Sequence, residues 1–323
     1  MTVLVTGGAG FVGRPLCDAL LARGETVRVL DLADEGVPGT EHLKGSIIDA
    51  DIVQHAMVGV SCVFHLAGNA QLWAPDPGVF DIVNRAGTDT VLVAAEAARV
   101  ERFVHCSSLT TLIGRRNPQR PIDLDETQRL KPDDMLGAYP RSKLLAERAA
   151  EAAAARGFNA VIALPTEPLG PGDVAITPPT RMLIDFLNGA NPAYVDAILN
   201  FVPVQSLAEG LLACADKGRA GERYLLGGEN IEMGRLLASR TPVRGAFGGF
   251  PVTRSAIAVS TAPAARATAK GSFRVGIVRP VRASSFARRR PLRAFGLRAA
   301  RRGSPPRKPN RSWAGSPPRW NQR

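Results

Sequence analysis

The chain begins with Thr2-Val-Leu-Val-Thr-Gly-Gly-Ala-Gly-Phe-Val-Gly13. Its apolar, β-branched start predicts a strand that ends at a glycine cluster, and the segment from Phe11 to Arg23 predicts a helix that stops at Gly24. A strand, a glycine turn and a helix N-terminus together can hold a dinucleotide pyrophosphate. Glycines let the backbone approach the phosphates, and the helix offers free N–H groups. The turn therefore predicts a nucleotide site.

The glycines of this turn fit two spacings. Gly8, Gly10 and Gly13 match the pattern G-x-G-x-x-G, whereas Gly7, Gly10 and Gly13 match the wider pattern G-x-x-G-x-x-G. Such patterns precede dinucleotide-binding helices, and a glycine pattern alone is weak evidence. The choice between the two spacings therefore depends on the rest of the chain.

An acid ends the next predicted strand, residues 26–31. A carboxylate about 20 residues past the glycines can accept hydrogen bonds from the adenosine ribose hydroxyls. Its charge would repel the 2′-phosphate of NADP, so Asp31 favours NAD over NADP. Because Asp is also common where strands turn, a purely structural role is the alternative interpretation.

Predicted strands alternate with predicted helices along the chain. This order favours an α/β fold with a doubly wound, mostly parallel sheet of the Rossmann type. Ligands bind such sheets at the carboxyl ends of the strands, where the glycine turn, Asp31, residues 65–68 and Ser107-Ser108 all fall. Further strands are expected at 42–47, 61–68, 102–108, 159–164, 200–204 and 222–227, and further helices at 49–57, 79–100, 137–156, 178–188, 207–217 and from 231 onward.

Charge is divided unevenly along the 323 residues, whose formal net charge is +12. Residues 240–323 hold 20 of the 41 Lys and Arg residues and none of the 29 Asp and Glu residues, so residues 1–239 carry a net charge of −8. Because Arg, Ala, Pro, Ser and Gly dominate residues 240–323, we expect disorder there. One hypothesis is an out-of-frame segment of a GC-rich gene, which resequencing would test. The other is a basic arm for nucleic acid or an anionic membrane.

The remaining features of the sequence indicate a cytoplasmic protein. No stretch approaches the roughly 18 apolar residues of a membrane span, and no secretory signal is visible. No His, Cys or carboxylate group has metal-ligand spacing, so no metal is expected. The four cysteines lie far apart without C-x-x-C spacing and are expected to be buried thiols in a reducing cytosol: Cys17, Cys62, Cys106 and Cys214.

Tyr139 and Lys143 lie four residues apart at the start of a predicted helix, and therefore on one face of it. A tyrosine can act as an acid/base catalyst when a neighbouring ammonium lowers the pKa of its phenol toward neutrality. The alternative is a coincidence of two amphipathic side chains on a helix surface. The position of the pair, one helix after a strand that ends in hydroxyls, favours the catalytic interpretation.

With these features the chain resembles the extended short-chain dehydrogenase/reductases, the NAD-dependent epimerase/dehydratase family. The resemblance covers residues 1 to about 239 and favours the spacing Gly7, Gly10, Gly13. Its segments are Thr6–Gly13, Asp31, His65-Leu-Ala-Gly68, Asn84-x-x-Gly-Thr88, Ser107-Ser108, Tyr139-Pro-Arg-Ser-Lys143 and 165–173. Residues 178–180, 185–189, 192–195 and 221–230 are most similar to the hopanoid-associated sugar epimerases, which stand close to the dihydroflavonol-4-reductase-like branch.

The resemblance implies a role for each matching residue. Tyr139 would move the proton of the substrate hydroxyl or carbonyl, Lys143 would bind the nicotinamide ribose and lower the tyrosine pKa, and Ser108 would hydrogen-bond the reacting oxygen. A homodimer through the helices at 79–100 and 139–156 is also implied. Contacts to NAD are implied for Gly7, Gly10, Phe11, Val12, Gly13, Asp31, Ser46, Ile47, Leu66, Ala67, Gly68, Asn84, Tyr139, Lys143 and Pro165.

The chain departs from the family pattern at several points. The segment from Ser108 to Gly114 is one residue longer than usual, so counting back from Gly114 puts Leu109 in the hydroxyl position, whereas the strand direction favours Ser108. Ser107 and Thr110 are further candidates. The other departures are Ser46 in place of a common acid near the adenine, Gly68 in place of an alanine, and Pro203-Val-Gln-Ser206 without the acids that usually open the next helix.

These observations predict three parts of the chain. Residues 1–164 would form the NAD-binding part, residues 165–239 a partial substrate lobe interleaved with the last core elements, and residues 240–323 a basic tail. The predicted function is reversible hydride transfer at a hydroxyl of a sugar or sugar nucleotide, of the epimerase/dehydratase type. The alternatives are an NAD(P)H-dependent ketone reductase of the dihydroflavonol-4-reductase type and a non-catalytic dinucleotide-binding protein with a lost substrate lobe.

Overall fold

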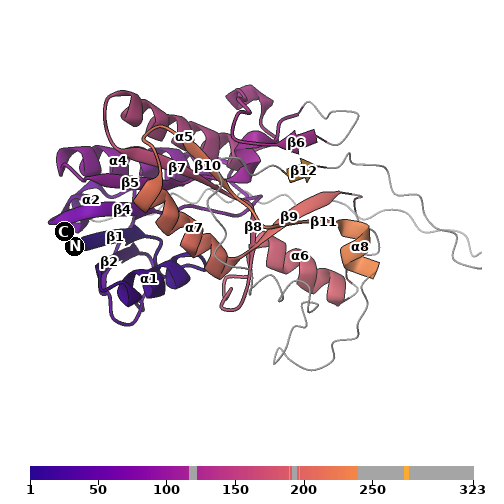
Figure 1. The fold of residues 1–323 in the computed structure, drawn as a ribbon, viewed down its shortest axis with the longest axis horizontal. Coiled ribbons are helices and arrows are strands. Elements are labelled where there is room, and N and C mark those ends of the chain that lie inside the picture. Colours follow the sequence, from indigo (N-terminus) through magenta and orange to yellow (C-terminus); the bar gives the residue numbers. More distant parts are fainter. Residues whose placement is uncertain (116–121, 189, 191–194, 196, 239–272, 276–323) are drawn as a thin grey trace, which may run out of the picture. The chain divides into compact units, whose positions relative to one another are not determined.

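A seven-stranded sheet forms the centre of the protein in a computed structural model that describes residues 1–115, 122–188, 190, 195, 197–238 and 273–275 (Figure 1). Neighbouring strands of this sheet are parallel, in the order β10-β7-β5-β4-β1-β2-β3. The α/β fold with a parallel sheet is therefore confirmed. The strands are β1 (Thr2–Thr6), β2 (Thr26–Asp31), β3 (Glu41–Lys44), β4 (Val60–His65), β5 (Arg102–Cys106), β7 (Ala160–Pro165) and β10 (Arg223–Leu226).

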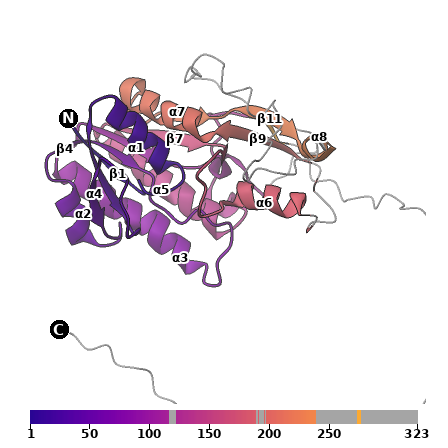
Figure 2. The same ribbon diagram turned by 90° about the horizontal axis from the view of Figure 1, so that it is seen from below.

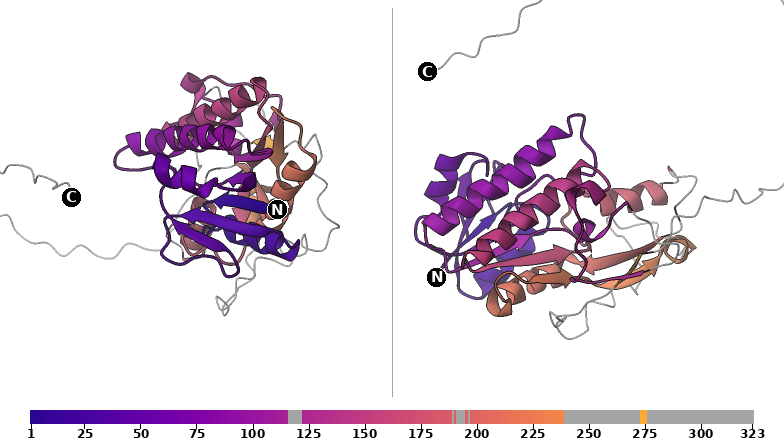
Figure 3. Two further views of the ribbon diagram at one scale, coloured as in Figure 1. Left: turned by 90° about the vertical axis from the view of Figure 1, so that its left-hand side faces the viewer. Right: turned by 90° about the horizontal axis from the view of Figure 1, so that it is seen from above.

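Helices cover both faces of this sheet (Figures 1 and 3). Side chains alternate between the faces along each strand, so that Leu4 enters one buried apolar cluster while Val3 and Val5 enter the other. Burial of both faces explains why the strands are almost continuously apolar. One face carries α2 (Ala50–Ala56), α4 (Gly87–Ala97) and α5 (Ala138–Ala155), and the other carries α1 (Gly13–Ala22) and α7 (Val204–Lys217).

The helix expected over residues 79–100 is divided into three pieces. A short α3 (Gly78–Phe80) leads into a π-helical segment, η1 (Asp81–Ala86), and α4 follows. A π-helical turn inserts an extra residue and changes the direction of the side chains around it. Asn84 lies in this segment and is buried.

A smaller sheet of three strands, in the order β11-β9-β8, lies at one end of the main sheet together with α6 and α8 (Figure 2). The strand β9 and the helix α6 match the expected elements, but β8 and β11 were not expected. Both are only three or four residues long, too short for a clear hydrophobic period. The elements are β8 (Glu167–Leu169), α6 (Pro178–Leu187), β9 (Ile198–Pro203), β11 (Glu229–Glu232) and α8 (Met233–Ala238).

The predictions for the basic tail lie outside the described residues, except for three residues of backbone. This segment, β12 (Phe273–Val275), pairs antiparallel with β6 (Ile122–Leu124). Among the described residues, no helix has both the length and the apolar character needed to cross a membrane.

The cysteines are free thiols, as expected. Three of them are buried, and burial raises the pKa of Cys17, Cys62 and Cys214 to about 12. Cys106 is only half-buried and lies at the end of β5, beside the candidate site.

Candidate active site

The glycine turn joins β1 to α1 at the carboxyl edge of the sheet. Gly7 has φ = 73°, in the left-handed region that favours glycine. A Cβ atom on Gly13 would lie 2.3 Å from the Gly7 carbonyl oxygen, closer than atoms can approach. A Cβ on Gly8 would lie 2.7 Å from a methyl of Val29. Glycine is therefore needed at Gly7, Gly8 and Gly13, while a Cβ on Gly10 would lie 3.1 Å from the Gly7 carbonyl oxygen.

Asp31 braces this turn. Its Oδ2 atom accepts a hydrogen bond from the Ala9 N–H at 3.0 Å, and its Oδ1 atom accepts one from the Ala33 N–H at 3.0 Å. Each carboxylate oxygen can accept a second hydrogen bond, and the residue is only half-buried. Asp31 can therefore hold the turn and still accept hydrogen bonds from a ribose.

These groups fit a dinucleotide. The first N–H groups of α1 have no partner within the helix, and the glycines before them leave no Cβ atoms in the way of a pyrophosphate. Asp31 adds a carboxylate at the adjacent strand end. When bound, NAD would supply the carbon that gives or takes a hydride.

The other predicted cofactor contacts line the same edge of the sheet. The Leu66 and Ala67 N–H groups donate to the backbone and side-chain oxygens of Thr6, which ties the end of β4 to the glycine turn. Ile47 packs against Gly87. Ser46 accepts a long hydrogen bond from the Ile48 N–H at 3.4 Å. Phe11 and Val12 lead into α1, and Pro165 is the last residue of β7.

Asn84 uses its side chain on protein groups in this structure. Its amide nitrogen donates to the Asn69 carbonyl oxygen at 3.1 Å and to Ser142 Oγ at 3.0 Å, and its Oδ1 atom accepts from the Asn69 N–H at 2.7 Å. A Cβ on Gly68 would lie 2.9 Å from this Oδ1 atom, which explains why glycine replaces the usual alanine there. Asn84 therefore links the loop after β4 to α5.

A chain of buried hydrogen bonds connects the first strand to Asn84. Thr6 Oγ1 lies 2.8 Å from His65 Nδ1, His65 Nε2 lies 2.9 Å from Thr88 Oγ1, and Thr88 donates to the Asn84 carbonyl oxygen at 2.6 Å. Burial lowers the pKa of His65 to about 3, so the ring is neutral at physiological pH. His65 is thus a strand residue inside a structural network.

His105 stacks on His65, with ring centroids 5.6 Å apart. Both of its ring nitrogens are buried without a hydrogen-bond partner among the described residues. Burial lowers the pKa of His105 well below its ordinary value. Within the described part of the chain, no group of three His, Cys, Asp or Glu residues is arranged to hold a metal ion.

Tyr139, Lys143 and Ser108 meet where β5 ends beside the first turn of α5. The Ser108 hydroxyl lies near enough to the Tyr139 phenol to oppose the rise in its pKa, and Lys143 Nζ donates to the Cys106 carbonyl oxygen at 2.6 Å. The Phe80 ring packs edge-on against the Tyr139 ring, with centroids 6.0 Å apart. The structure therefore brings the three predicted groups together.

The choice of Ser108 agrees with the local geometry. Ser108 caps a 3₁₀ turn, η2 (Leu109–Leu112), by accepting from the Thr110 N–H, while the Thr110 hydroxyl donates to Ser108 Oγ at 3.0 Å. Leu109 packs into the apolar core instead. Counting from the strand therefore selects a hydroxyl at the carboxyl edge, whereas counting back from Gly114 selects a leucine buried in the core.

Burial dominates the ionisation of the pair. It raises the pKa of the Tyr139 phenol, although the nearby Ser108 hydroxyl opposes this shift. It lowers the pKa of the Lys143 ammonium, against the opposing effects of Cys106 and Glu147. The expected lowering of the tyrosine pKa by Lys143 is therefore not found in this structure, in which the ammonium donates to a carbonyl oxygen.

A parallel sheet with a glycine turn after its first strand and an acid after its second defines a Rossmann-type dinucleotide-binding fold. A model of the NAD dependent epimerase/dehydratase family matches residues 3–227. The chain belongs to this family.

Three relatives illustrate the similarity. A provisionally named dihydroflavonol 4-reductase from Synechocystis sp. is 35% identical, over 75% of this chain and 72% of its own. A 4-hydroxy-2-methyl-3-oxo-4-farnesyl-3,4-dihydroquinoline-1-oxide ketoreductase from Stigmatella aurantiaca is 33% identical, over 70% and 68%. The structure of a UDP-glucose 4-epimerase from Thermus thermophilus in complex with NAD is 25% identical, with a TM-score of 0.63 over 72% of this chain and 79% of that one.

Proposed function

We propose that the protein binds NAD(H) and interconverts a carbonyl group and a secondary alcohol of a small molecule. The observation that carries this proposal is the contact of Tyr139 with Ser108 at the carboxyl edge, with Lys143 one turn away on the same helix face. A phenol and a second hydroxyl pointing at one place can bind one carbonyl oxygen from two sides. The glycine turn and Asp31 lie at the same edge of the sheet and would hold the dinucleotide.

Each residue would have a distinct task in the reduction direction. Ser108 would donate a hydrogen bond to the carbonyl oxygen, and Tyr139 would transfer its proton to that oxygen as the alcohol forms. Lys143 would hydrogen-bond the nicotinamide ribose and favour the phenolate that remains. The burial of these three groups would keep bulk water from competing for the oxygen.

Ketone reduction is the reaction that we place first. The relatives that are 35% and 33% identical both have reductase names, and one of them is named for a ketone. Leu72 and Trp73, in the loop after β4, are 64% and 75% exposed, and Leu136, just before α5, is 61% exposed. Apolar side chains exposed at the same edge of the sheet would favour an apolar ketone over a charged sugar nucleotide.

Sugar epimerisation is the second candidate. It is supported by the family's epimerase/dehydratase model and by the epimerase from Thermus thermophilus. In that reaction a hydroxyl would be oxidised and the hydride returned, without net consumption of the cofactor. The division into a dinucleotide part at 1–164 and a substrate lobe at 165–239, and a homodimer through α4 and α5, are also proposals.

The two reactions differ in their cofactor balance. With NADH and a dihydroflavonol or an aryl ketone, the ketone reductase would consume NADH in a 1:1 ratio to the alcohol formed. With NAD and UDP-glucose, the epimerase would change the sugar while the absorbance of NADH at steady state stays near zero. A chain that binds NADH but does neither would support the non-catalytic alternative.

Replacing Asp31 by Ala is expected to weaken NADH binding about 10- to 100-fold, because each charge-assisted hydrogen bond to a ribose contributes about 1.5–3 kcal/mol. NADPH should bind no more weakly than to the wild type, since the repelling charge is gone. Fluorescence titration with both cofactors would measure the change in preference. Asp34→Ala is the matched control, because Asp34 is an exposed acid that pairs with Lys44. Equal NADH affinity of wild type and Asp31→Ala would contradict the assignment.

A further inference from the structure

Three consecutive residues at the end of β5 bind one face of α5. Their partners are four residues apart along the helix, so all three point from the same side of it. Two of these contacts are hydrogen bonds of 2.6 Å. Lys143 Nζ donates to the Cys106 carbonyl oxygen, and Ser107 Oγ donates to Glu147 Oε2. The pairs are Cys106 with Lys143, Ser107 with Glu147, and Ser108 with Tyr139.

We call these three pairs the ladder. Glu147 is the most buried of its three helix residues and has no role in the reaction proposed above. Its side chain is 1% exposed. Besides the Ser107 hydroxyl, its Oε2 atom accepts from the Thr111 hydroxyl at 2.9 Å, and its Oε1 atom accepts from Arg223 Nη1 at 2.8 Å. The carboxylate is therefore held by donors from the end of β5, from the turn after β5 and from β10.

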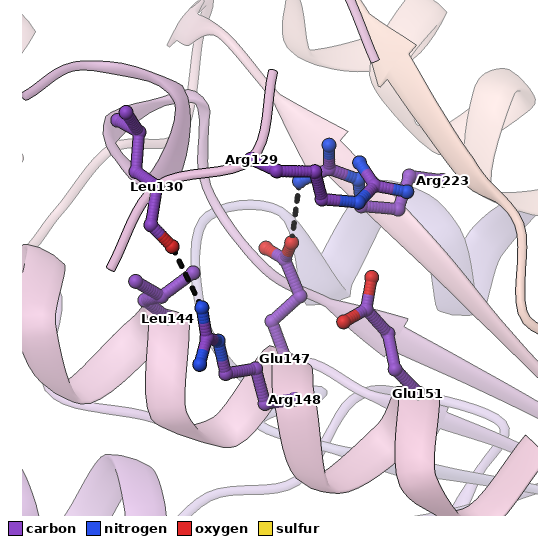
Figure 4. A pocket seen from close by; sticks show the side chains of 7 residues that line it. All are labelled: Arg129, Leu130, Leu144, Glu147, Arg148, Glu151 and Arg223. Atoms are coloured by element: carbon purple, nitrogen blue, oxygen red, sulfur yellow. Dashed lines mark hydrogen bonds and ion pairs between the residues drawn. The ribbon is translucent and has the colours of Figure 1, made fainter. Parts of the chain in front are cut away.

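Arg223 is itself buried, with 2% of its side chain exposed. Its second terminal nitrogen donates to the carbonyl oxygens of Glu126 and Gln128, in the segment that precedes α5. The pair lines a cavity of about 270 Å³, in which Figure 4 shows the carboxylates of Glu147 and Glu151 below the guanidinium groups of Arg129 and Arg223. The arginine thus ties the last strand of the sheet to the helix and to the segment before it.

The spacing of the contacts explains what Glu147 adds. The bonds of Ser142 to Asn84 and of Lys143 to Cys106 already hold α5 near Tyr139. Glu147 lies eight residues beyond Tyr139, or about 12 Å at 1.5 Å per residue. It adds a further fixed point one turn beyond Lys143. Together these contacts hold the first turns of α5 against the end of β5.

Stability alone does not account for this arrangement. Taking two charges out of water is costly, and a buried ion pair often stabilises a protein no more than apolar residues of the same size. Removing one partner is destabilising, because the other charge stays buried. The ion pair fixes a geometry at little net gain in stability, and that geometry is the one on which Tyr139 and Ser108 depend.

We propose that Glu147, held by Arg223, is a positioning residue that sets the contact between Tyr139 and Ser108 through Ser107. This proposal rests on the proposed function, because positioning matters only if Tyr139 transfers a proton. Glu147 would touch neither substrate nor cofactor. It would act through its hydrogen bonds to Ser107 and Thr111, and Arg223 would hold its carboxylate in place.

The first test removes the Ser107 hydroxyl and leaves the ion pair intact. Ser107→Ala is expected to lower kcat about 10- to 100-fold, since small displacements of a reacting group are that costly. The KM of the ketone that the wild type reduces and the Kd of NADH should stay within about twofold, because Ser107 is buried and its hydroxyl donates to Glu147. Glu147→Gln should retain most of the activity of the wild type, because the amide can donate to Ser107 and Thr111 while its oxygen still accepts from Arg223.

A second measurement does not depend on turnover. In protein labelled with ¹³Cζ-tyrosine and saturated with NADH, the signal assigned through Tyr139→Phe reports the hydrogen bonding of the phenol. It should move in Ser107→Ala and stay in place in Glu151→Gln. Glu151 is the matched control, because it lies one turn further along the same helix and lines the same cavity. This experiment separates the proposals: if no substrate is turned over, the proposed function fails, while the signal still tests the contact.

Two results would contradict a positioning role of Glu147. A Ser107→Ala protein with a lower melting temperature, but with the Tyr139 signal and kcat of the wild type, would show that the ladder serves stability only. A shift of the same size in Glu151→Gln would show that any charge change near this cavity disturbs the phenol.

Discussion

Replacing Tyr139 by Phe is expected to lower turnover about 10²- to 10⁴-fold, because the variant has no acid to protonate the forming alcohol and general acid–base catalysis typically contributes that much. NADH should bind with nearly unchanged affinity, since the glycine turn and Asp31 are untouched. The phenyl ring fills the same space against Phe80. Ser108 keeps its contacts with Thr110, so the free energy of unfolding should change by no more than about 1 kcal/mol.

Stopped-flow kinetics with NADH and a ketone would measure this loss, and fluorescence titration would measure NADH binding. Tyr224→Phe is the matched control. Tyr224 is half-buried, and its hydroxyl lies 3.0 Å from Glu222 Oε2 and 3.0 Å from the Arg219 backbone nitrogen. The control should turn over at the rate of the wild type. Turnover of Tyr139→Phe within tenfold of the wild type would rule out proton transfer by the phenol.

Replacing Gly13 by Ala is expected to abolish NADH binding and to destabilise the protein. The new Cβ atom would lie 2.3 Å from the Gly7 carbonyl oxygen and 2.6 Å from the Gly8 Cα atom. Both are backbone atoms, which cannot turn away as a side chain can, so the whole turn must move. Overpacking of this kind costs about 1–3 kcal/mol or more. The loss of NADH affinity should exceed about 100-fold, because a displaced turn no longer presents its N–H groups to the pyrophosphate.

The control for this variant separates the turn from general backbone strain. Gly24, like Gly7, has a left-handed φ, 78°, but a Cβ there would meet nothing within 4 Å. Gly24→Ala should cost about 1–2 kcal/mol of stability and leave NADH binding intact. Chemical denaturation and titration with NADH would measure both quantities. Full affinity in Gly13→Ala would mean that the pyrophosphate binds elsewhere.

The main sheet was predictable because its strands carry strong local signals. The apolar run before the glycines, the acid that ends β2 and the Asp49 cap of α2 each follow from short-range physics, and Asp49 does accept hydrogen bonds from the Asp51 and Ile52 N–H groups. The π-helical segment was not predictable in the same way. A single extra residue leaves the helical period of the sequence almost unchanged, and the hydrogen bond of Asn84 to Ser142 in α5 joins residues 58 positions apart.

The candidate site was predictable only where its residues form a motif. Tyr139 and Lys143 are four residues apart, and Ser108 follows a strand, so spacing alone suggested that they meet. Glu147 repeats the same four-residue step, a signal that could have been used. Its partner Arg223 is 76 residues away, however, and only the sheet order β10-β7-β5 brings the two together.

The ion pair between Glu147 and Arg223 also has a consequence for how the chain is made. On the ribosome, Glu147 emerges 76 residues before its counterion. At 5–20 residues per second, about 4–15 s pass in which α5 exists without Arg223. During that interval burial would favour the neutral form of Glu147, because burial raises the pKa of its carboxyl to about 7 even in the folded protein. The ion pair can form only once β10 has joined the sheet, so the last of the bonds that hold Glu147 is made after β1 to β7 are complete.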